Sequence, residues 1–281
     1  MTSIIEDKIS VAFPDINEEE LAEISMILSM RRSFDMSAYK DNYLRRRVAI
    51  RIRSTHCSTP GEYCNLLRQD SQELDQLQKT LTIHVSQFFR NPTMFEKLRS
   101  DLLPGIFAAL KPEPLQIWCL GCAAGEEPYS LAILLREYFS QEIRQLSLTI
   151  IGTDIDQGVL QAAHAAHYSA ERVKDVPEKL LDRYFHQEDS QFCLIEEIRE
   201  MVTFIQADIT NFDHYLPSNL VMCRNTLIYF NRADQEKILI GIAGTLVPGG
   251  LLVLGKSETL VGEARRRFES ICPVERIYRR L

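Results

Sequence analysis

A glycine-containing turn and two glutamates stand between an apolar run and an amphipathic run in residues 117–133, IWCLGCAAGEEPYSLAI. A strand, a turn and the start of a helix are typical of a nucleotide-binding site, because a helix N-terminus carries about half a positive charge and holds anions. Glu126 and Glu127 already place negative charge at that position. We therefore expect a neutral or cationic ligand there rather than a pyrophosphate.

The glycine spacing also argues against a dinucleotide. Gly121 and Gly125 follow the pattern G-x-x-x-G, whereas the dinucleotide-binding turn carries G-x-G-x-x-G. Asp154 closes a second apolar run, where a carboxylate can accept hydrogen bonds from a ribose diol. Together these features favour a nucleoside that bears positive charge. S-adenosylmethionine, with its adenosine, sulfonium and ammonium groups, fits. Asp156 is expected to serve as a local turn or cap residue.

Short β-rich runs alternate with helical segments after about residue 100, which predicts an α/β fold with a doubly wound, mostly parallel sheet. Ligands bind beyond the carboxyl ends of the strands in such a sheet. Those strand ends fall at residues 121–127, 153–156, 208–210 and 224–229. Residues 2–79 have a helical pattern throughout, and Thr59 with Pro60 marks the start of one helix. We predict a helical domain over 1–85 and a sheet domain over 86–281, with an edge strand within 271–281.

Composition places the chain among ordinary globular proteins, since 45% of its 281 residues are apolar and 25% are charged. The first residues show no secretion signal, and no run approaches the roughly 18 apolar residues of a membrane span. A cytoplasmic protein without membrane insertion is expected. The seven cysteines are scattered and odd in number, which predicts reduced thiols. Cys119 and Cys122 form a CxxC without a second pair at zinc spacing, so no metal is expected.

Positive charge is concentrated in one segment of this acidic chain. Eight basic and two acidic residues between Arg31 and Arg53 give a local net charge of +6, whereas the whole chain carries −7. An apolar stripe of Leu44, Val48 and Ile52 should pack inward on a helix. We interpret the arginines as a face for an acidic partner; a purely solvated face is the alternative. Nucleic acid is not expected, because the segment's aromatic residues offer no base-stacking platform. The predicted substrate-binding residues are Arg45, Arg46, Arg47, Arg51 and Arg53.

Five motifs occur in order after this basic segment: SQFFRNPTMFEKL, GCAAGEEPYSLAI, GTDID, CRNTLIYF and GGLLVLGKSE. The ensemble resembles the chemoreceptor glutamate methyltransferases, the CheR family. The resemblance implies an S-adenosylmethionine-dependent protein-glutamate O-methyltransferase of the corresponding fold, with a small β-subdomain inserted at about 165–200. Acidic methylation helices of chemoreceptors would be its partners. Some family members also bind a receptor C-terminal peptide through a glycine-containing loop; residues 184–204 contain no glycine, so this tether is not expected here.

The same resemblance implies the residues of the site. Arg90 would orient the substrate carboxylate or the cofactor, and Tyr229 would form a hydrogen bond near the reacting centre. Family members often have Asn and Thr where this chain has His84 and Ser86. Which of Glu126 and Glu127 touches the cofactor stays open, and the other could cap the helix. The implied cofactor contacts are His84, Ser86, Arg90, Gly121, Glu126, Glu127, Asp154, Asp208, Ile209, Arg224 and Asn225.

Two other functions stay open at this point. A methyltransferase of the same fold could act on a small molecule or another protein, and a substrate that must lose a proton would need a base near Tyr229. A module without catalysis could bind the nucleoside or a signalling partner. Methyl incorporation into receptor fragments distinguishes the three.

Overall fold

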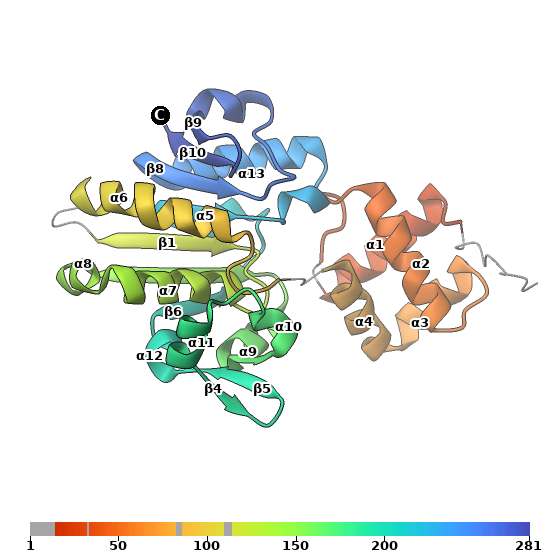
Figure 1. Cartoon of the computed structure of the whole chain (residues 1–281). Helices are drawn as coiled ribbons and strands as arrows, with labels where there is room; N and C mark the ends of the chain where they lie inside the picture. The colour runs from red at the N-terminus through yellow and green to blue at the C-terminus, as the bar shows by residue number, and fades with distance from the viewer. Residues whose placement is uncertain (1–14, 33, 83–85, 110–113) are drawn as a thin grey trace, which may run out of the picture. The chain divides into compact units, whose positions relative to one another are not determined.

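The computed structural model describes residues 15–32, 34–82, 86–109 and 114–281 (Figure 1). The chain divides into two compact units, Met1–Ile83 and His84–Leu281. His84, an implied cofactor contact, lies outside the described residues. None of the described helices is long and apolar enough to span a bilayer.

The described part of the first unit contains four helices, α1 (Glu18–Arg32), α2 (Asp41–Ser54), α3 (Pro60–Gln69) and α4 (Ser71–Leu81). The predicted start of α3 is confirmed, because Thr59 Oγ1 accepts a hydrogen bond from the Glu62 backbone N–H at 3.2 Å and Pro60 is the first helical residue. Leu44, Val48 and Ile52 of α2 are buried as predicted. This stripe packs into the interior of the helical unit.

The second unit is built on a seven-stranded sheet in the order β6-β2-β1-β7-β8-β10-β9. Strands β6, β2, β1, β7 and β8 are mutually parallel, which confirms the predicted fold class. The prediction of an edge strand within 271–281 is wrong for β10, because β10 pairs antiparallel with both β8 and β9. The seven strands are β1 (Leu115–Leu120), β2 (Leu148–Asp154), β6 (Val202–Gln206), β7 (Ser218–Cys223), β8 (Leu246–Leu254), β9 (Phe268–Cys272) and β10 (Ile277–Arg280).

Helices contact the sheet at its parallel strands. Helix α7 contacts β1, β2 and β6, and α9 contacts β2 and β6. Trp118 in β1 is buried, and its Nε1–H donates to Thr153 Oγ1 of β2 at 3.1 Å. Asp156 caps α9 as predicted, because its Oδ1 accepts from the Gly158 N–H at 2.7 Å. The helical segments outside the small inserted sheet include α5 (Pro92–Lys97), the π-helix at Leu98–Leu102, α6 (Leu103–Ala109), α7 (Glu126–Tyr138), α8 (Ser140–Gln145), α9 (Gln157–Ala165) and α13 (Arg232–Thr245).

A small antiparallel sheet is inserted between α9 and β6, as the family resemblance implies. Its strand order is β3-β5-β4, and β4 and β5 form a projecting hairpin (Figure 1). One face of this sheet packs on the core through Tyr168, Phe185 and Leu194. The three strands are β3 (His167–Ser169), β4 (Phe185–Glu188) and β5 (Gln191–Leu194), with short helices α10 (Ala170–Val173), α11 (Glu178–Tyr184) and α12 (Glu196–Arg199) around them.

All seven cysteines are free thiols, as predicted. Cys119 lies within β1, and Cys122 lies in the turn that follows this strand. Both side chains are buried, and burial raises the pKa of both thiols well above the usual value. The CxxC pair therefore consists of packed, protonated side chains at neutral pH.

Candidate active site at the carboxyl ends of the parallel strands

The turn after β1 holds three residues in the left-handed backbone region. The φ angles of Gly121, Ala123 and Gly125 are 66°, 51° and 86°. A Cβ atom on Gly121 would lie 2.4 Å from Thr226 Oγ1, so only glycine fits beneath the turn after β7. Backbone conformations of this kind cluster at functional sites, where the surrounding structure maintains them.

Asp154 connects this turn to the end of β2. Its carboxylate is buried, Oδ2 accepts from the Ala123 N–H at 3.0 Å and Oδ1 accepts from the Asp156 N–H at 3.1 Å. Each carboxylate oxygen has two acceptor positions, so these bonds leave capacity for a ribose hydroxyl. Asp154 thus shapes the turn as well as offering an acceptor, a second role that the sequence does not reveal.

Glu126 opens α7 and is completely buried, with an exposed fraction of 0%. Its Oε1 pairs with Arg172 of α10 at 2.5 Å, and the same guanidinium donates to the Ser86 carbonyl at 2.7 Å. Burial raises the pKa of Glu126, and the Arg172 charge opposes that rise. The second oxygen, Oε2, is buried and has no hydrogen-bond partner among the described residues. Buried acceptors in proteins normally have a hydrogen-bond donor, so this oxygen lacks one.

Glu127 pairs with Arg224, whose side chain is almost fully buried. The Arg224 guanidinium also donates to the Arg90 carbonyl at 2.8 Å and to Asn91 Oδ1 at 2.7 Å. Neither glutamate is the N-cap residue of α7, because Gly125 occupies that position. The two glutamates are thus not the free negative charges expected from the sequence, because each pairs with an arginine from a distant segment.

The segment before α5 lies against the first turn of α7. Phe89 and Asn91 have positive φ angles of 51° and 62°. The Phe89 N–H donates to Ser130 Oγ at 2.9 Å, and Arg172 holds Ser86 as described. The half-buried Arg90 therefore comes from a loop that is fixed on both sides.

The remaining predicted residues lie after β6 and β7. Asp208 is half-buried, and its Oδ1 accepts from the Thr210 N–H and hydroxyl at 2.8 Å each. The Ile209 carbonyl accepts from the Tyr215 hydroxyl at 2.8 Å. Asn225 has a φ angle of 59°, and Tyr229 ends the 3₁₀ turn Leu227–Tyr229. All of these segments follow parallel strands, so they belong to one edge of the sheet.

Comparison with known proteins identifies this arrangement. The family described as "CheR methyltransferase, SAM binding domain" matches residues 84–275, and "CheR methyltransferase, all-alpha domain" matches residues 19–82. The chain belongs to the CheR methyltransferase family. Both units of the structure thus correspond to family domains.

Three curated relatives are similar to this chain. Chemotaxis protein methyltransferase 2 of Vibrio cholerae is 34% identical over 84% of this chain and 82% of its own length. The chemotaxis protein methyltransferase of Listeria innocua is 27% identical over 89% of this chain and 94% of its own length. An uncharacterized 104.1 kDa protein of Rhodobacter capsulatus is 31% identical over 99% of this chain, which spans only 30% of that protein.

S-adenosylmethionine is the cofactor of this CheR family member. The residues at the strand edge fit it on structural grounds. An acid closes β2, where a ribose is recognised in nucleoside-binding sheets. The buried Oε2 of Glu126, which has no hydrogen-bond partner in the described part of the chain, matches an ammonium group, which offers donors and positive charge. The turn from Gly121 to Gly125 carries no large side chain between these two points.

Glu258 is a residue that sequence reasoning did not single out in this CheR family chain. It is buried, and its Oε2 accepts from the Gly255 N–H at 2.7 Å and the Asn225 N–H at 2.9 Å. Its Oε1 accepts from the Ile228 N–H at 3.3 Å. Burial raises the pKa of Glu258, and the backbone donors oppose that rise. The carboxylate holds the turn that carries Tyr229; its position in the motif GGLLVLGKSE was the available signal.

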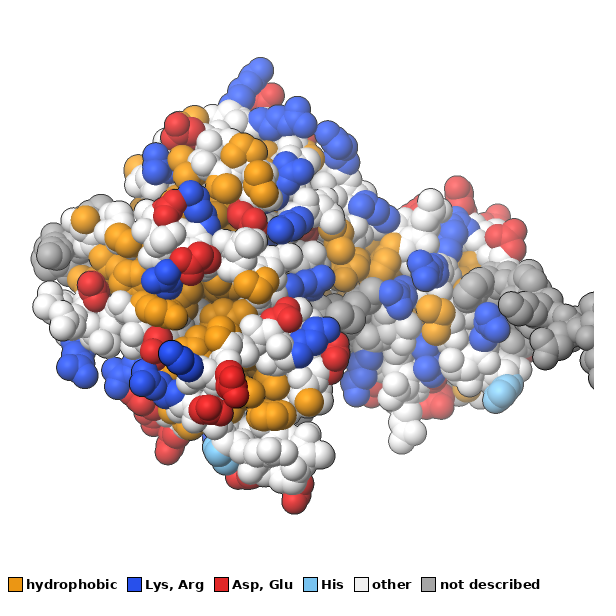
Figure 2. All heavy atoms as spheres, in the orientation of Figure 1, with side chains coloured by type: hydrophobic (Ala, Val, Ile, Leu, Met, Phe, Trp, Pro, Cys, Tyr) orange, Lys and Arg blue, Asp and Glu red, His pale blue; other side chains and the backbone are white. Residues whose placement is uncertain are grey.

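The predicted substrate arginines of α2 do not share one environment. Arg46 and Arg53 are exposed, and Arg45 and Arg47 are half-buried. The prediction that Arg51 binds the substrate is corrected by the structure. Its guanidinium forms an ion pair at 2.6 Å with the buried Glu73 of α4 and faces the interior of the unit. The charge in this segment is therefore partly neutralised by other helices. The viewed face of the helical unit still carries several Lys or Arg side chains (Figure 2).

Proposed function

We propose that the protein methylates glutamate side chains on the signalling helices of chemoreceptors, producing glutamyl methyl esters. The names of the Vibrio and Listeria relatives support a role in chemotaxis. The observation that carries the proposal is the strand-edge site of this CheR family chain. There an acid after β2, a close-approach turn and a buried carboxylate oxygen without a partner among residues 15–32, 34–82, 86–109 and 114–281 come together.

The proposed chemistry needs positioning rather than a strong base. A glutamate carboxylate has a pKa of about 4.3 in solution and is already an anion at neutral pH. When bound, S-adenosylmethionine would supply an activated methyl group to the substrate carboxylate and would be converted to S-adenosylhomocysteine. Orientation and exclusion of water are then the tasks of the protein.

Named residues of this chain are assigned to those tasks. Asp154 accepts from the ribose, and Glu126 Oε2 accepts from the ammonium, with Gly121, Asp208, Ile209 and Asn225 lining the nucleoside. Glu127 and Arg224 hold the loop of Arg90 in place through the bonds to the Arg90 carbonyl and Asn91. Arg90 orients the substrate carboxylate, and Tyr229 donates a hydrogen bond at the reacting centre. Exposed arginines of α2, Arg46 and Arg53, attract the acidic receptor helix.

Transfer of a tritiated methyl group from S-adenosylmethionine to purified receptor fragments tests the proposal. Label should enter the fragments and be released by base as methanol, which is diagnostic of a methyl ester. Arg90→Ala should lower turnover by roughly a hundredfold while cofactor affinity stays close to that of the unmodified protein, because its role is at the reacting centre. Base-stable label, or label that enters only small molecules or other proteins, would contradict the proposal.

A further inference from the structure

The outer face of the small sheet brings together four side chains that can bind a metal. Cys193 in the central strand β5 is in register with His167 of β3 and His186 of β4. Side chains of directly paired residues point to the same face of a sheet, and Glu188, two residues after His186, shares that face. The opposite face carries the core residues Tyr168, Phe185 and Leu194. The cluster therefore lies on the face turned away from the core.

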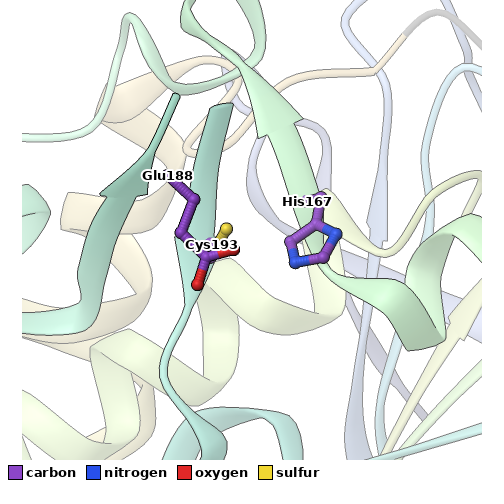
Figure 3. Close-up of side chains that lie close together, drawn as sticks. All are labelled: His167, Glu188 and Cys193. Atoms are coloured by element: carbon purple, nitrogen blue, oxygen red, sulfur yellow. The ribbon is translucent and has the colours of Figure 1, made fainter. Parts of the chain in front are cut away.

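The potential ligand atoms are close to one another. Those of His167, Glu188 and Cys193 all lie within 4.8 Å of each other, and Figure 3 shows these side chains side by side. Nε2 of His186 lies 3.0 Å from Glu188 Oε1 and brings a second imidazole to the group. Ligands of a tetrahedral ion with metal–ligand distances of about 2.0–2.3 Å are separated by somewhat less than 4 Å. The separations of up to 4.8 Å among His167, Glu188 and Cys193 are therefore close to those that a bound ion requires.

The burial pattern of the cluster is unusual for an outer sheet face. Cys193 is only 3% exposed although it points away from the core. His186 and Glu188 side chains are 53% and 60% exposed. The cluster therefore combines a shielded sulfur with an imidazole and a carboxylate that reach solvent.

We propose that this cluster is a Zn²⁺ site formed by His167, His186, Glu188 and Cys193. Two imidazole nitrogens, one thiolate and one carboxylate are ligands that zinc accepts in tetrahedral geometry. The thiol proton leaves to solvent when the sulfur binds. The site would cross-link all three strands of the small sheet. None of its four residues is among those assigned to the cofactor, and neither the methyl transfer nor the family match accounts for it.

This inference departs from the expectation that no metal is bound. That expectation rested on ligand pairs at short sequence spacing, such as CxxC. Here the ligands come from three strands at positions 167, 186, 188 and 193, and only strand pairing brings them together.

Zinc binding to the full chain, measured by calorimetry after treatment with a chelator, tests the site. One Zn²⁺ per chain is expected, and Co²⁺ should give a thiolate-to-cobalt absorption band with the visible bands of a tetrahedral site. Cys193→Ser should abolish the thiolate band. His186→Gln and Glu188→Gln alter exposed side chains without burying a new group, and each should weaken Zn²⁺ binding at least about tenfold.

Cys272→Ser and His214→Gln serve as matched controls, because they remove a thiol and an imidazole from other parts of the same unit. Both should bind Zn²⁺ like the unmodified chain. Affinity for S-adenosylmethionine should be retained by all five variants, which shows that they are folded. The proposal is overturned if no stoichiometric Zn²⁺ binds, if Cys193→Ser keeps the thiolate band, or if the control variants lose binding equally.

Discussion

Two buried glutamates, one in each unit, pair with arginines in different ways. In the helical unit, Glu73 Oε1 accepts from Arg51 at 3.0 Å and from the Tyr63 hydroxyl at 2.6 Å, and Oε2 accepts from Arg51 at 2.6 Å. In the sheet unit, Glu126 uses only one oxygen, which pairs with Arg172, and the other is buried without a partner among the described residues.

The number of paired carboxylate oxygens distinguishes a structural glutamate, Glu73, from a ligand-binding one, Glu126. A carboxylate with both oxygens satisfied stabilises its surroundings and has nothing left to offer a ligand. A buried oxygen without a partner carries a desolvation cost that a cationic ligand would remove. The comparison therefore predicts that a change at Glu73 affects stability alone, whereas a change at Glu126 affects cofactor affinity.

The largest effect is expected from Glu73→Gln. Removal of the negative charge leaves Arg51, whose side chain is only 18% exposed, without its counter-ion, so the helical unit should lose up to about 3–5 kcal/mol of unfolding free energy. Urea denaturation followed by far-ultraviolet circular dichroism measures this loss. Asp75→Asn is the control, because Asp75 pairs with Arg32 near the surface and should cost less than about 1 kcal/mol. Equal losses for the two variants would show that the Glu73 pair is not structural.

Glu126→Gln is expected to weaken S-adenosylmethionine binding by roughly tenfold to a hundredfold. A hydrogen bond between charged groups contributes about 1.5–3 kcal/mol, and glutamine keeps the shape but not the charge. Calorimetry of the folded variant measures the affinity. Glu137→Gln is the matched control on the same helix, where the carboxylate pairs with Arg183. Unchanged affinity for Glu126→Gln would assign the ammonium contact to another residue.

The pH dependence of the same binding step sharpens the comparison. Burial raises the pKa of Glu126 above its ordinary value near 4.5. Below the raised pKa the carboxyl group is neutral, so cofactor affinity should fall as pH decreases through that value. The native protein binds the Glu126 proton more tightly than the unfolded chain does. The contribution of Glu126 to the free energy of unfolding therefore increases as pH falls through the raised pKa.

Affinity titrations at several pH values test this expectation. In Glu126→Gln, the cofactor affinity should no longer show the part of its pH dependence that lies above about pH 4.5. Glu258 also has a raised pKa, but its oxygens accept from backbone N–H groups, so Glu258→Gln should keep that part. An identical pH profile in Glu126→Gln and the unmodified protein would exclude Glu126 as the titrating group.

The smallest effect is expected on the surface of the helical unit. Arg46→Glu with Arg53→Glu should raise the KM for a receptor fragment by roughly threefold and reduce its salt dependence, because exposed charges are weak and screened. Cofactor affinity should not change. Methylation rates against receptor concentration at low and high salt measure the effect. An unaltered KM at low salt would mean that these arginines form only a solvated face.

Local signals made much of the structure predictable. Alternating runs predicted the parallel strands, and Thr59 with Pro60 and Asp156 predicted helix starts, because caps act within three residues of their own position. Long-range pairings were not predictable in this way. Arg172 reaches Glu126 across 46 positions, and Arg51 reaches Glu73 across 22. The place of β10 between β8 and β9 likewise depends on tertiary packing, which leaves no spacing signature.

Trp118 gives the two units different optical signatures. It is the single tryptophan of the chain, and it lies buried in β1 with its indole N–H bonded to Thr153 and its ring edge-on to Tyr215. Its fluorescence therefore follows the unfolding of the sheet unit and does not follow that of helices α1–α4. Circular dichroism reports both units. A difference between the two unfolding curves would measure, without any label, whether the units melt together or one after the other.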